Sequence, residues 1–177
     1  MTDRHDYVIV GGGSAGAVLA ARLSENPDTR VALLEAGPPD RSVLIHCPAG
    51  LVVMAQTGTA NWAFQTVPQP GLGGRRGYQP RGKVLGGSSS INAMCYIRGE
   101  RRDYDEWAEL GATGWHWDNV LPYFRKAEGN ERGADALHGG DGPLGVSDHR
   151  YRNPLSAVFV ESAKQAGAHW DAAGRDV

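Results

Sequence analysis

The N-terminal part of the chain changes from a strand pattern to a helix pattern and back. Residues 7–10 (Tyr-Val-Ile-Val) form a short, continuously apolar run, which is typical of a strand buried on both faces of a parallel sheet. From Ser14 to Glu25 the apolar residues recur at helical spacing, and residues 30–34 form a second apolar run. This order predicts a βαβ unit and therefore an α/β fold with a parallel sheet.

The rest of the chain is predicted to be loops and helices with few strands. The stretch from Asp40 to Pro80 reads as irregular, apart from an alternating segment at 62–67 that predicts a short strand. A glycine-rich turn at 139–143 leads into a predicted strand at 144–146. Helical spacing predicts three further helices, over residues 101–110, 117–127 and 154–166. No repeat or linker separates these elements, so we interpret them as helical insertions in one incomplete domain.

Composition and charge exclude several classes of protein. The 177 residues are 41% hydrophobic and 21% charged, as in a globular chain, and the net charge of −2 gives no reason to expect a nucleic-acid or anionic-membrane partner. Two cysteines, Cys47 and Cys95, exclude a disulfide framework and a four-cysteine zinc site. With neither a secretion-signal pattern nor an apolar stretch of ~20 residues, we expect no membrane span and a cytoplasmic location. The 25 glycines are about twice the usual share and predict tight backbone loops.

A glycine motif joins the first predicted strand to the first helix. Residues 11–16 (Gly-Gly-Gly-Ser-Ala-Gly) fit G-x-G-x-x-G. In that motif Gly11 permits the sharp turn, Gly13 lets a pyrophosphate approach the backbone, and Gly16 lets the helix pack closely on the sheet. Glu35 ends the second strand where an acidic residue is expected to hydrogen-bond a ribose. The alternative interpretation is a structural turn without a ligand. Otherwise the pattern predicts a site for the adenosine part of a dinucleotide. The carboxylate of Glu35 disfavours the 2′-phosphate of NADP, and the motif does not distinguish FAD from NAD.

A second glycine cluster favours FAD over NAD. Gly86 and Gly87 are followed by three serines, which predicts another backbone cradle running into a helix, with Arg81 and Lys83 supplying positive charge. An NAD domain needs one cradle, whereas two indicate a larger cofactor held at both ends. A serine-capped helix after a turn is the alternative interpretation.

These residues resemble the glucose–methanol–choline (GMC) oxidoreductases, flavoenzymes that oxidise alcohols. The similarity extends from Asp6 to about Gly167, and residues 82–92 (Gly-Lys-Val-Leu-Gly-Gly-Ser-Ser-Ser-Ile-Asn) carry the family signature. Further segments resemble the choline dehydrogenase and acceptor-linked alcohol dehydrogenase branch, at residues 61–64, 96–99, 103–107, 114–115 and 153–155.

The resemblance implies a Rossmann-like FAD-binding domain of which residues 1–177 are the N-terminal part. It assigns residues 1–37 to an ADP-binding βαβ unit, 81–99 to a loop along the flavin phosphate and isoalloxazine, and 100–177 to a helical extension. Ile91 stands where covalently tethered relatives have histidine, so FAD is expected to be non-covalent. The residues assigned to FAD are Gly11, Gly13, Ser14, Ala15, Gly16, Glu35, Ala36, Arg81, Lys83, Gly86, Gly87, Ser88, Asn92, Ala93 and Met94.

The resemblance also implies oxidation of the CH–OH group of an alcohol, with hydride transfer to flavin N5. Trp62 falls where some relatives place an aromatic residue at the substrate pocket, although a core tryptophan is the simpler interpretation. The family's catalytic histidine lies near the C-terminus of longer chains. No residue here is therefore assigned to catalysis or to a metal, and we expect this chain alone to be inactive. The histidines outside that context are His5, His46, His116, His138, His149 and His169.

Two other interpretations stay open. After Ala168 the family pattern is lost over residues 169–177, as in a truncated or frameshifted reading frame, so a non-catalytic nucleotide-binding fragment is one alternative. An NAD-dependent dehydrogenase is a less favoured one. The alcohol, the electron acceptor and the oligomeric state are not determined by the sequence.

Overall fold

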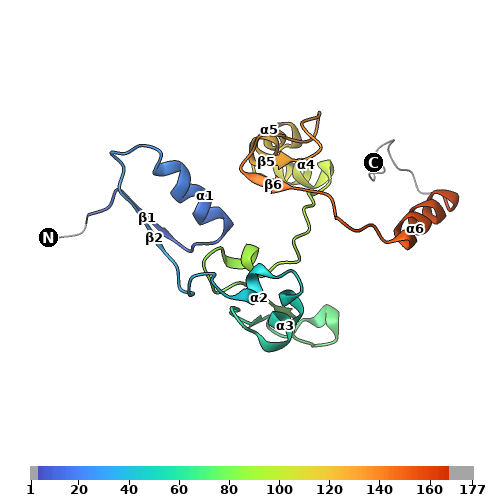
Figure 1. Cartoon of the computed structure of the whole chain (residues 1–177), viewed down its shortest axis with the longest axis horizontal. Coiled ribbons are helices and arrows are strands. Elements are labelled where there is room, and N and C mark those ends of the chain that lie inside the picture. The colour runs from blue at the N-terminus through green and yellow to red at the C-terminus, as the bar shows by residue number, and fades with distance from the viewer. Residues whose placement is uncertain (1–3, 168–177) are drawn as a thin grey trace. The chain divides into compact units, whose positions relative to one another are not determined.

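A computed structural model describes residues 4–167, which divide into two compact units (Figure 1). The first unit extends to Cys95 and the second begins at Tyr96. The division falls within the 81–99 segment that was assigned to the flavin. Each unit is described by itself.

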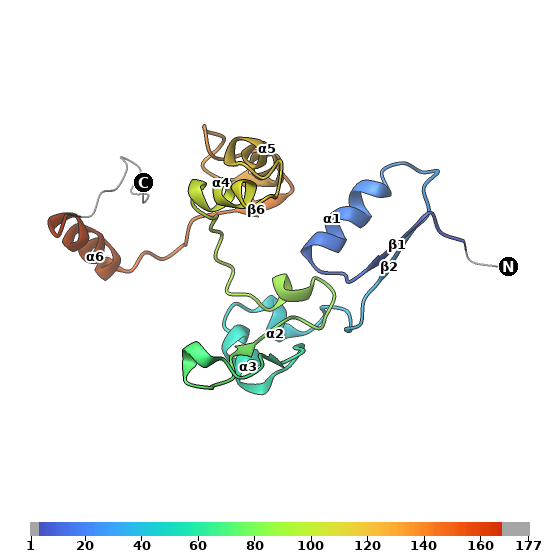
Figure 2. The ribbon, with the colours of Figure 1, turned by 180° about the vertical axis from the view of Figure 1, so that it is seen from behind.

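The first unit begins with the predicted βαβ arrangement. Strand β1 (Tyr7–Val10), helix α1 (Ser14–Leu23) and strand β2 (Val31–Leu34) follow one another, and the strands pair in parallel. The register runs from Tyr7 opposite Val31 to Val10 opposite Leu34. Helix α1 lies alongside the strand pair in both views (Figures 1 and 2). The sequence prediction is confirmed here, except that α1 ends two residues before Glu25.

The predicted burial of β1 on both faces is wrong for the described residues. Tyr7, Val8 and Val10 are 49%, 59% and 83% exposed. A parallel strand is buried when neighbouring strands and helices on both faces cover it. The sheet described here has two strands and one adjoining helix, α1, so Tyr7, Val8 and Val10 stay exposed.

The predicted irregular stretch contains two helices. Helix α2 (Val43–His46) is a single turn whose start is capped by Ser42, which accepts a hydrogen bond from Leu44 N at 3.3 Å. Helix α3 (Gly50–Thr57) ends at Gly58 in the left-handed region (φ +68°), where glycine is preferred. Because Cys47 and Pro48 interrupt the apolar spacing between the two helices, the period of the segment did not indicate them.

Short strands and a 3₁₀ turn complete the first unit. Strand β3 (Phe64–Gln65) pairs antiparallel with β4 (Tyr78–Gln79) and is shorter than the predicted 62–67. A 3₁₀ turn, η1, covers Pro70–Leu72. The second glycine motif was predicted to open a helix, but it forms only the 3₁₀ turn η2 (Gly87–Ser90).

The second unit contains the three other predicted helices. They are α4 (Arg101–Glu109), α5 (Trp117–Ala127) and α6 (Pro154–Gln165). The predicted strand at 144–146 is present as β6 (Leu144–Val146), and it pairs in parallel with β5 (Glu128–Asn130), which the pattern did not indicate. No helix among residues 4–167 is long and apolar enough to cross a bilayer.

Glu128 is the one charged side chain that is buried among residues 4–167, with an exposed fraction of 0%. Its carboxylate pairs with the Arg98 guanidinium and accepts a hydrogen bond from Asn130 Nδ2 at 2.9 Å. Arg98 also donates to the Leu137 carbonyl, and its guanidinium lies 5.1 Å from the centre of the Phe124 ring. This ion pair joins the segment before α4 to the strand after α5.

Candidate functional site

The first glycine motif forms a sharp turn that presents the start of α1. Gly11 has φ +101° and donates its N–H to the Leu34 carbonyl at 2.7 Å, which ties the turn to β2. Gly13 occupies the N-cap position of α1. The first N–H groups of a helix have no partner within the helix, and with the helix dipole they favour an anion at this end.

The two glycine motifs, far apart in the sequence, are in direct contact. Gly13 and Gly86 form an isolated parallel bridge, and Gly86 N donates to the Gly12 carbonyl at 2.8 Å. A Cβ atom on Gly87 would lie 2.8 Å from Gly13 Cα, closer than real Cβ atoms come. The backbone of Gly87 also has φ +58°, so both packing and conformation require glycine there. The sequence predicted two cradles but not that they touch.

Glu35 is held at the end of β2 by two backbone amides. Gly37 N donates to Oε1 at 2.8 Å and Gly12 N donates to Oε2 at 2.7 Å. These bonds, with that of Gly37 the stronger influence, hold the pKa of Glu35 below its ordinary value of 4.5. The carboxylate is therefore charged at neutral pH and keeps further lone pairs for ligand hydroxyls.

We expect Glu35→Gln to destabilise the chain at pH 7, because one amide N–H would then face the NH₂ group of glutamine. A carboxyl whose pKa is lowered by folding stabilises the protein above its ordinary pKa, and this contribution is lost as the pH falls through the folded pKa. The gap in unfolding free energy between wild type and Glu35→Gln should thus shrink from pH 7 towards pH 3. Urea unfolding across this range measures it, and a gap independent of pH would contradict the amide contacts of Glu35.

A pocket of about 390 Å³ lies where these elements meet. It brings together many of the residues predicted to bind the cofactor: Gly11, Gly13, Glu35, Ala36, Arg81, Gly87 and Ser88. Trp62 lines the same pocket, with Phe64, Val10, Leu34 and Gly82. The combination of a helix N-terminus, a carboxylate and apolar walls suits a ligand with both an anionic part and an aromatic part.

Trp62 and Phe64 form the aromatic wall of this pocket. Their rings stack with centres 5.7 Å apart at an angle of 7°. Lys83 Nζ lies 4.4 Å from the centre of the Trp62 ring on which it rests. Sequence reasoning did not single out Phe64. The signal that could have found it is the strand alternation, which places residues two apart on the same face.

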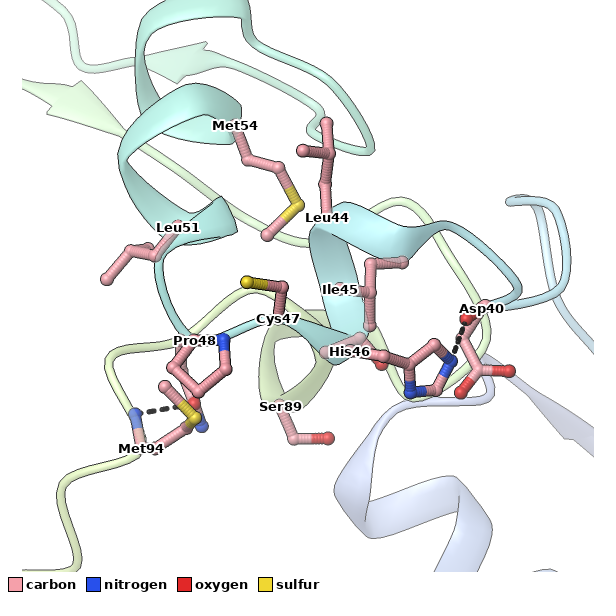
Figure 3. Close-up of a pocket in the computed structure, with 12 residues that line it drawn as sticks. Asp40, Leu44, Ile45, His46, Cys47, Pro48, Leu51, Met54, Ser89 and Met94 are labelled. Carbon is pink, nitrogen blue, oxygen red and sulfur yellow. Dashed lines mark hydrogen bonds between the residues drawn. The ribbon is translucent and has the colours of Figure 1, made fainter. Parts of the chain in front are cut away.

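Asn92 and Met94 line a second pocket of about 250 Å³, shown in Figure 3. Turn η2 contributes to both pockets, with Gly87 and Ser88 lining the first and Ser89 and Ser90 the second. The other walls come from α2, α3 and the residues beside them: Asp40, Leu44, Ile45, His46, Cys47, Pro48, Leu51 and Met54. No pattern in the sequence indicated these walls, because the apolar spacing of the segment is irregular.

The described histidines lie outside the pocket that contains Glu35. His46 lines the second pocket, with Nε2 at 2.6 Å from the Asp40 carbonyl oxygen. In the second unit, His116 Nδ1 lies 3.5 Å from an Asp105 oxygen, and His138 Nδ1 lies 2.9 Å from Asp135 Oδ1. Within residues 4–167 no group of three or more His, Cys, Asp or Glu side chains could hold a metal ion. His169 and the altered pattern at 169–177 lie outside the described residues.

Comparison with known proteins identifies close relatives. A family model described as GMC oxidoreductase matches residues 5–177. Mitochondrial choline dehydrogenase of Homo sapiens is 51% identical over 172 residues, covering 93% of this chain and 29% of that protein. Alcohol dehydrogenase [acceptor] of Pseudomonas putida is 49% identical over 180 residues, covering 96% of this chain and 33% of that protein.

A comparison with solved structures also finds a similar fold. Pyridoxine 4-oxidase from Mesorbium loti matches with a TM-score of 0.84 at 40% identity, covering 94% of this chain and 33% of that one. The chain thus spans about a third of the length of the proteins it matches. Because one relative is mitochondrial by name, the expected cytoplasmic location stays a prediction.

Proposed function

The chain belongs to the GMC oxidoreductase family, and we propose that it forms the FAD-binding part of an enzyme that oxidises the CH–OH group of alcohols, of the alcohol or choline dehydrogenase type. The family and its solved relatives indicate FAD as the cofactor. When bound, FAD supplies the hydride acceptor. The residues of this chain would bind and orient the cofactor.

The observation that carries the proposal is the space around Gly13. A Cβ atom there would meet only Gly87 Cα at 3.8 Å and the Gly86 carbonyl oxygen at 4.0 Å, which are ordinary contacts. Its backbone, at φ −74°, suits any residue. By contrast, a Cβ atom on Gly16 would lie well within 3.0 Å of the Gly11 carbonyl oxygen. Packing in the protein therefore explains Gly16 but not Gly13, whereas a pyrophosphate pressed against the backbone explains Gly13.

The pocket around Glu35 fits the adenosine and pyrophosphate parts of FAD. The N–H groups of Ser14 and Ala15 would hold the pyrophosphate at the start of α1. Glu35 and the backbone of Ala36 would hold the adenosine ribose, because the charged carboxylate accepts hydroxyl hydrogen bonds. Arg81, which lines the same pocket, would balance the phosphate charge.

We assign Trp62 to the cofactor and not to the substrate. Its ring shares a pocket with Glu35 and Arg81, whereas Asn92 and Met94, expected near the isoalloxazine, line the other pocket. The stacked pair of Trp62 and Phe64 offers a flat apolar surface, which suits an aromatic base. The ammonium group of Lys83 lies on Trp62 and would support this surface.

The test is Gly13→Ala in the 177-residue chain, with FAD, ADP and NAD titrated separately and binding followed by fluorescence or equilibrium dialysis. The added methyl group has room in the protein, so stability should fall by no more than about 1 kcal/mol, the usual cost of alanine at an N-cap. FAD and ADP should bind at least about tenfold more weakly, since one lost charge-assisted contact is worth about 1.5–3 kcal/mol. NAD should bind more weakly than FAD to the wild type.

Gly71→Ala is the matched control, because a Cβ atom on Gly71 meets nothing within 4 Å and the residue lies outside both pockets. FAD affinity should be unchanged by this substitution. Equal affinity for FAD in wild type and Gly13→Ala would disprove a pyrophosphate at Gly13.

We further propose that FAD is held without a covalent bond. Ile91 has no nucleophilic atom, and Cys95 is the nearest thiol in the sequence. Acid precipitation of the FAD-loaded chain should leave all flavin absorbance in the supernatant. Flavin that remains in a denatured, washed pellet would reveal a tether.

A further inference from the structure

The second glycine motif uses its polar side chains to hold its own backbone. Ser88 Oγ accepts from Gly82 N at 3.1 Å, Ser89 Oγ donates to the Gly86 carbonyl at 2.6 Å, and Ser90 Oγ donates to the Leu85 carbonyl at 2.8 Å. These bonds explain why the chain forms a 3₁₀ turn here and does not continue as an α-helix, because side chains that bond locally compete with helical hydrogen bonding.

The same arrangement continues at Asn92. Its Oδ1 atom accepts a hydrogen bond from Met94 N at 2.8 Å, one of the dashed lines in Figure 3. Met94 has φ +56°, a left-handed conformation that is uncommon for residues other than glycine. A short polar side chain that bonds the backbone two residues on stabilises such a turn.

We infer that Asn92 is a positioning residue, which acts on the cofactor by holding Met94 in the left-handed conformation and so shaping the backbone of residues 92–94. This inference rests on the proposed function and on the expectation, implied by the family resemblance, that this backbone lies near the isoalloxazine. The hydrogen bond from Met94 N to the carboxamide oxygen of Asn92 ties this side chain to the backbone of the turn.

Four variants of the 177-residue chain test the inference. Asn92→Leu keeps the size of the side chain and removes the acceptor, whereas Asn92→Ser keeps a neutral acceptor. Met94→Gly removes the need for support, because glycine adopts positive φ freely. The double variant, Asn92→Leu with Met94→Gly, tests rescue. FAD affinity is measured for each variant, and hydrogen exchange of the residue-94 amide is measured without FAD.

Asn92→Leu should weaken FAD binding about two- to tenfold, the range of one net hydrogen bond, and should speed exchange of the Met94 amide. Asn92→Ser should lie nearer to wild type than Asn92→Leu. The double variant should bind FAD as Met94→Gly alone does, because glycine at position 94 adopts the left-handed conformation without the support of Asn92.

Two results would overturn the inference. Unchanged exchange of the Met94 amide in Asn92→Leu would show that Asn92 does not hold the turn. A double variant that binds FAD more weakly than Met94→Gly, by the same factor that separates Asn92→Leu from wild type, would show that the Asn92 side chain itself contacts the cofactor. Absence of FAD binding by the wild type would instead count against the proposed function, and the exchange data, which need no FAD, keep the two failures apart.

Discussion

Replacing Arg98 with methionine should lower the free energy of unfolding by about 3–5 kcal/mol, the usual cost of leaving a buried charge without its partner. The methionine fills much of the space of the arginine stem but leaves the Glu128 carboxylate, which is fully buried, without its cation. Asn130 Nδ2, at 2.9 Å, and Gly139 N, at 3.4 Å, would remain as donors to that carboxylate. Urea unfolding followed by tryptophan fluorescence measures the loss.

Two further variants distinguish the cost of leaving a buried charge unpaired from the cost of losing an ion pair at the surface. Arg132→Met breaks the exposed pair with Asp148 in the same unit and should change stability far less, since water screens that pair. Adding Glu128→Gln to Arg98→Met should restore part of the loss, because the amide keeps an acceptor for Asn130 and carries no charge. Equal losses for Arg98→Met and Arg132→Met would show that Glu128 is hydrated.

Gly16→Ala should destabilise the chain by about 3 kcal/mol, the upper part of the usual range for an overpacked site. Its Cβ atom would overlap the Gly11 carbonyl oxygen, so the helix would have to move away from the turn. Alanine is favoured over glycine inside a helix by about 1 kcal/mol, and this gain is smaller than the expected clash.

Gly13→Ala is the matched control for Gly16→Ala, because it adds the same methyl group three residues away in the same motif. Thermal or urea unfolding should show that Gly16→Ala is much less stable than Gly13→Ala. The opposite order, or equal stabilities, would contradict the close approach of α1 to the turn after β1.

The parts of the fold that sequence reasoning found are those governed by local rules. The period of the apolar residues and the glycine turn were sufficient for β1, α1 and β2, and the helical spacing was sufficient for α4 to α6. Helices α2 and α3 were not predicted. Helix α2 is a single turn, too short to show a helical period, and Cys47 and Pro48 interrupt the apolar spacing before α3. The burial of β1 was overestimated because burial depends on neighbouring strands, which a local pattern does not contain.

In the candidate site, too, local features were predicted from the sequence and long-range contacts were not. Gly13, Glu35 and Gly87 were recognised from short motifs, each with its own physical reason. That they line one pocket depends on pairing between distant segments, such as Gly13 with Gly86 and Asn61 with Gly82. The second pairing also brings Trp62 beside Arg81, whose carbonyl accepts a hydrogen bond from Trp62 N at 2.8 Å. Contacts between distant segments cannot be predicted from the spacing of residues within one motif.

The contact between the two glycine motifs sets a time order for folding. During translation, β1, α1 and β2 leave the ribosome well before Gly86, so the βαβ unit is complete while the pocket still lacks its second wall. Closing so long a loop is slow relative to forming a local unit. A cofactor held by both walls would therefore bind after the main folding step. It would prolong the lifetime of the native state by slowing unfolding and would leave the folding rate nearly unchanged.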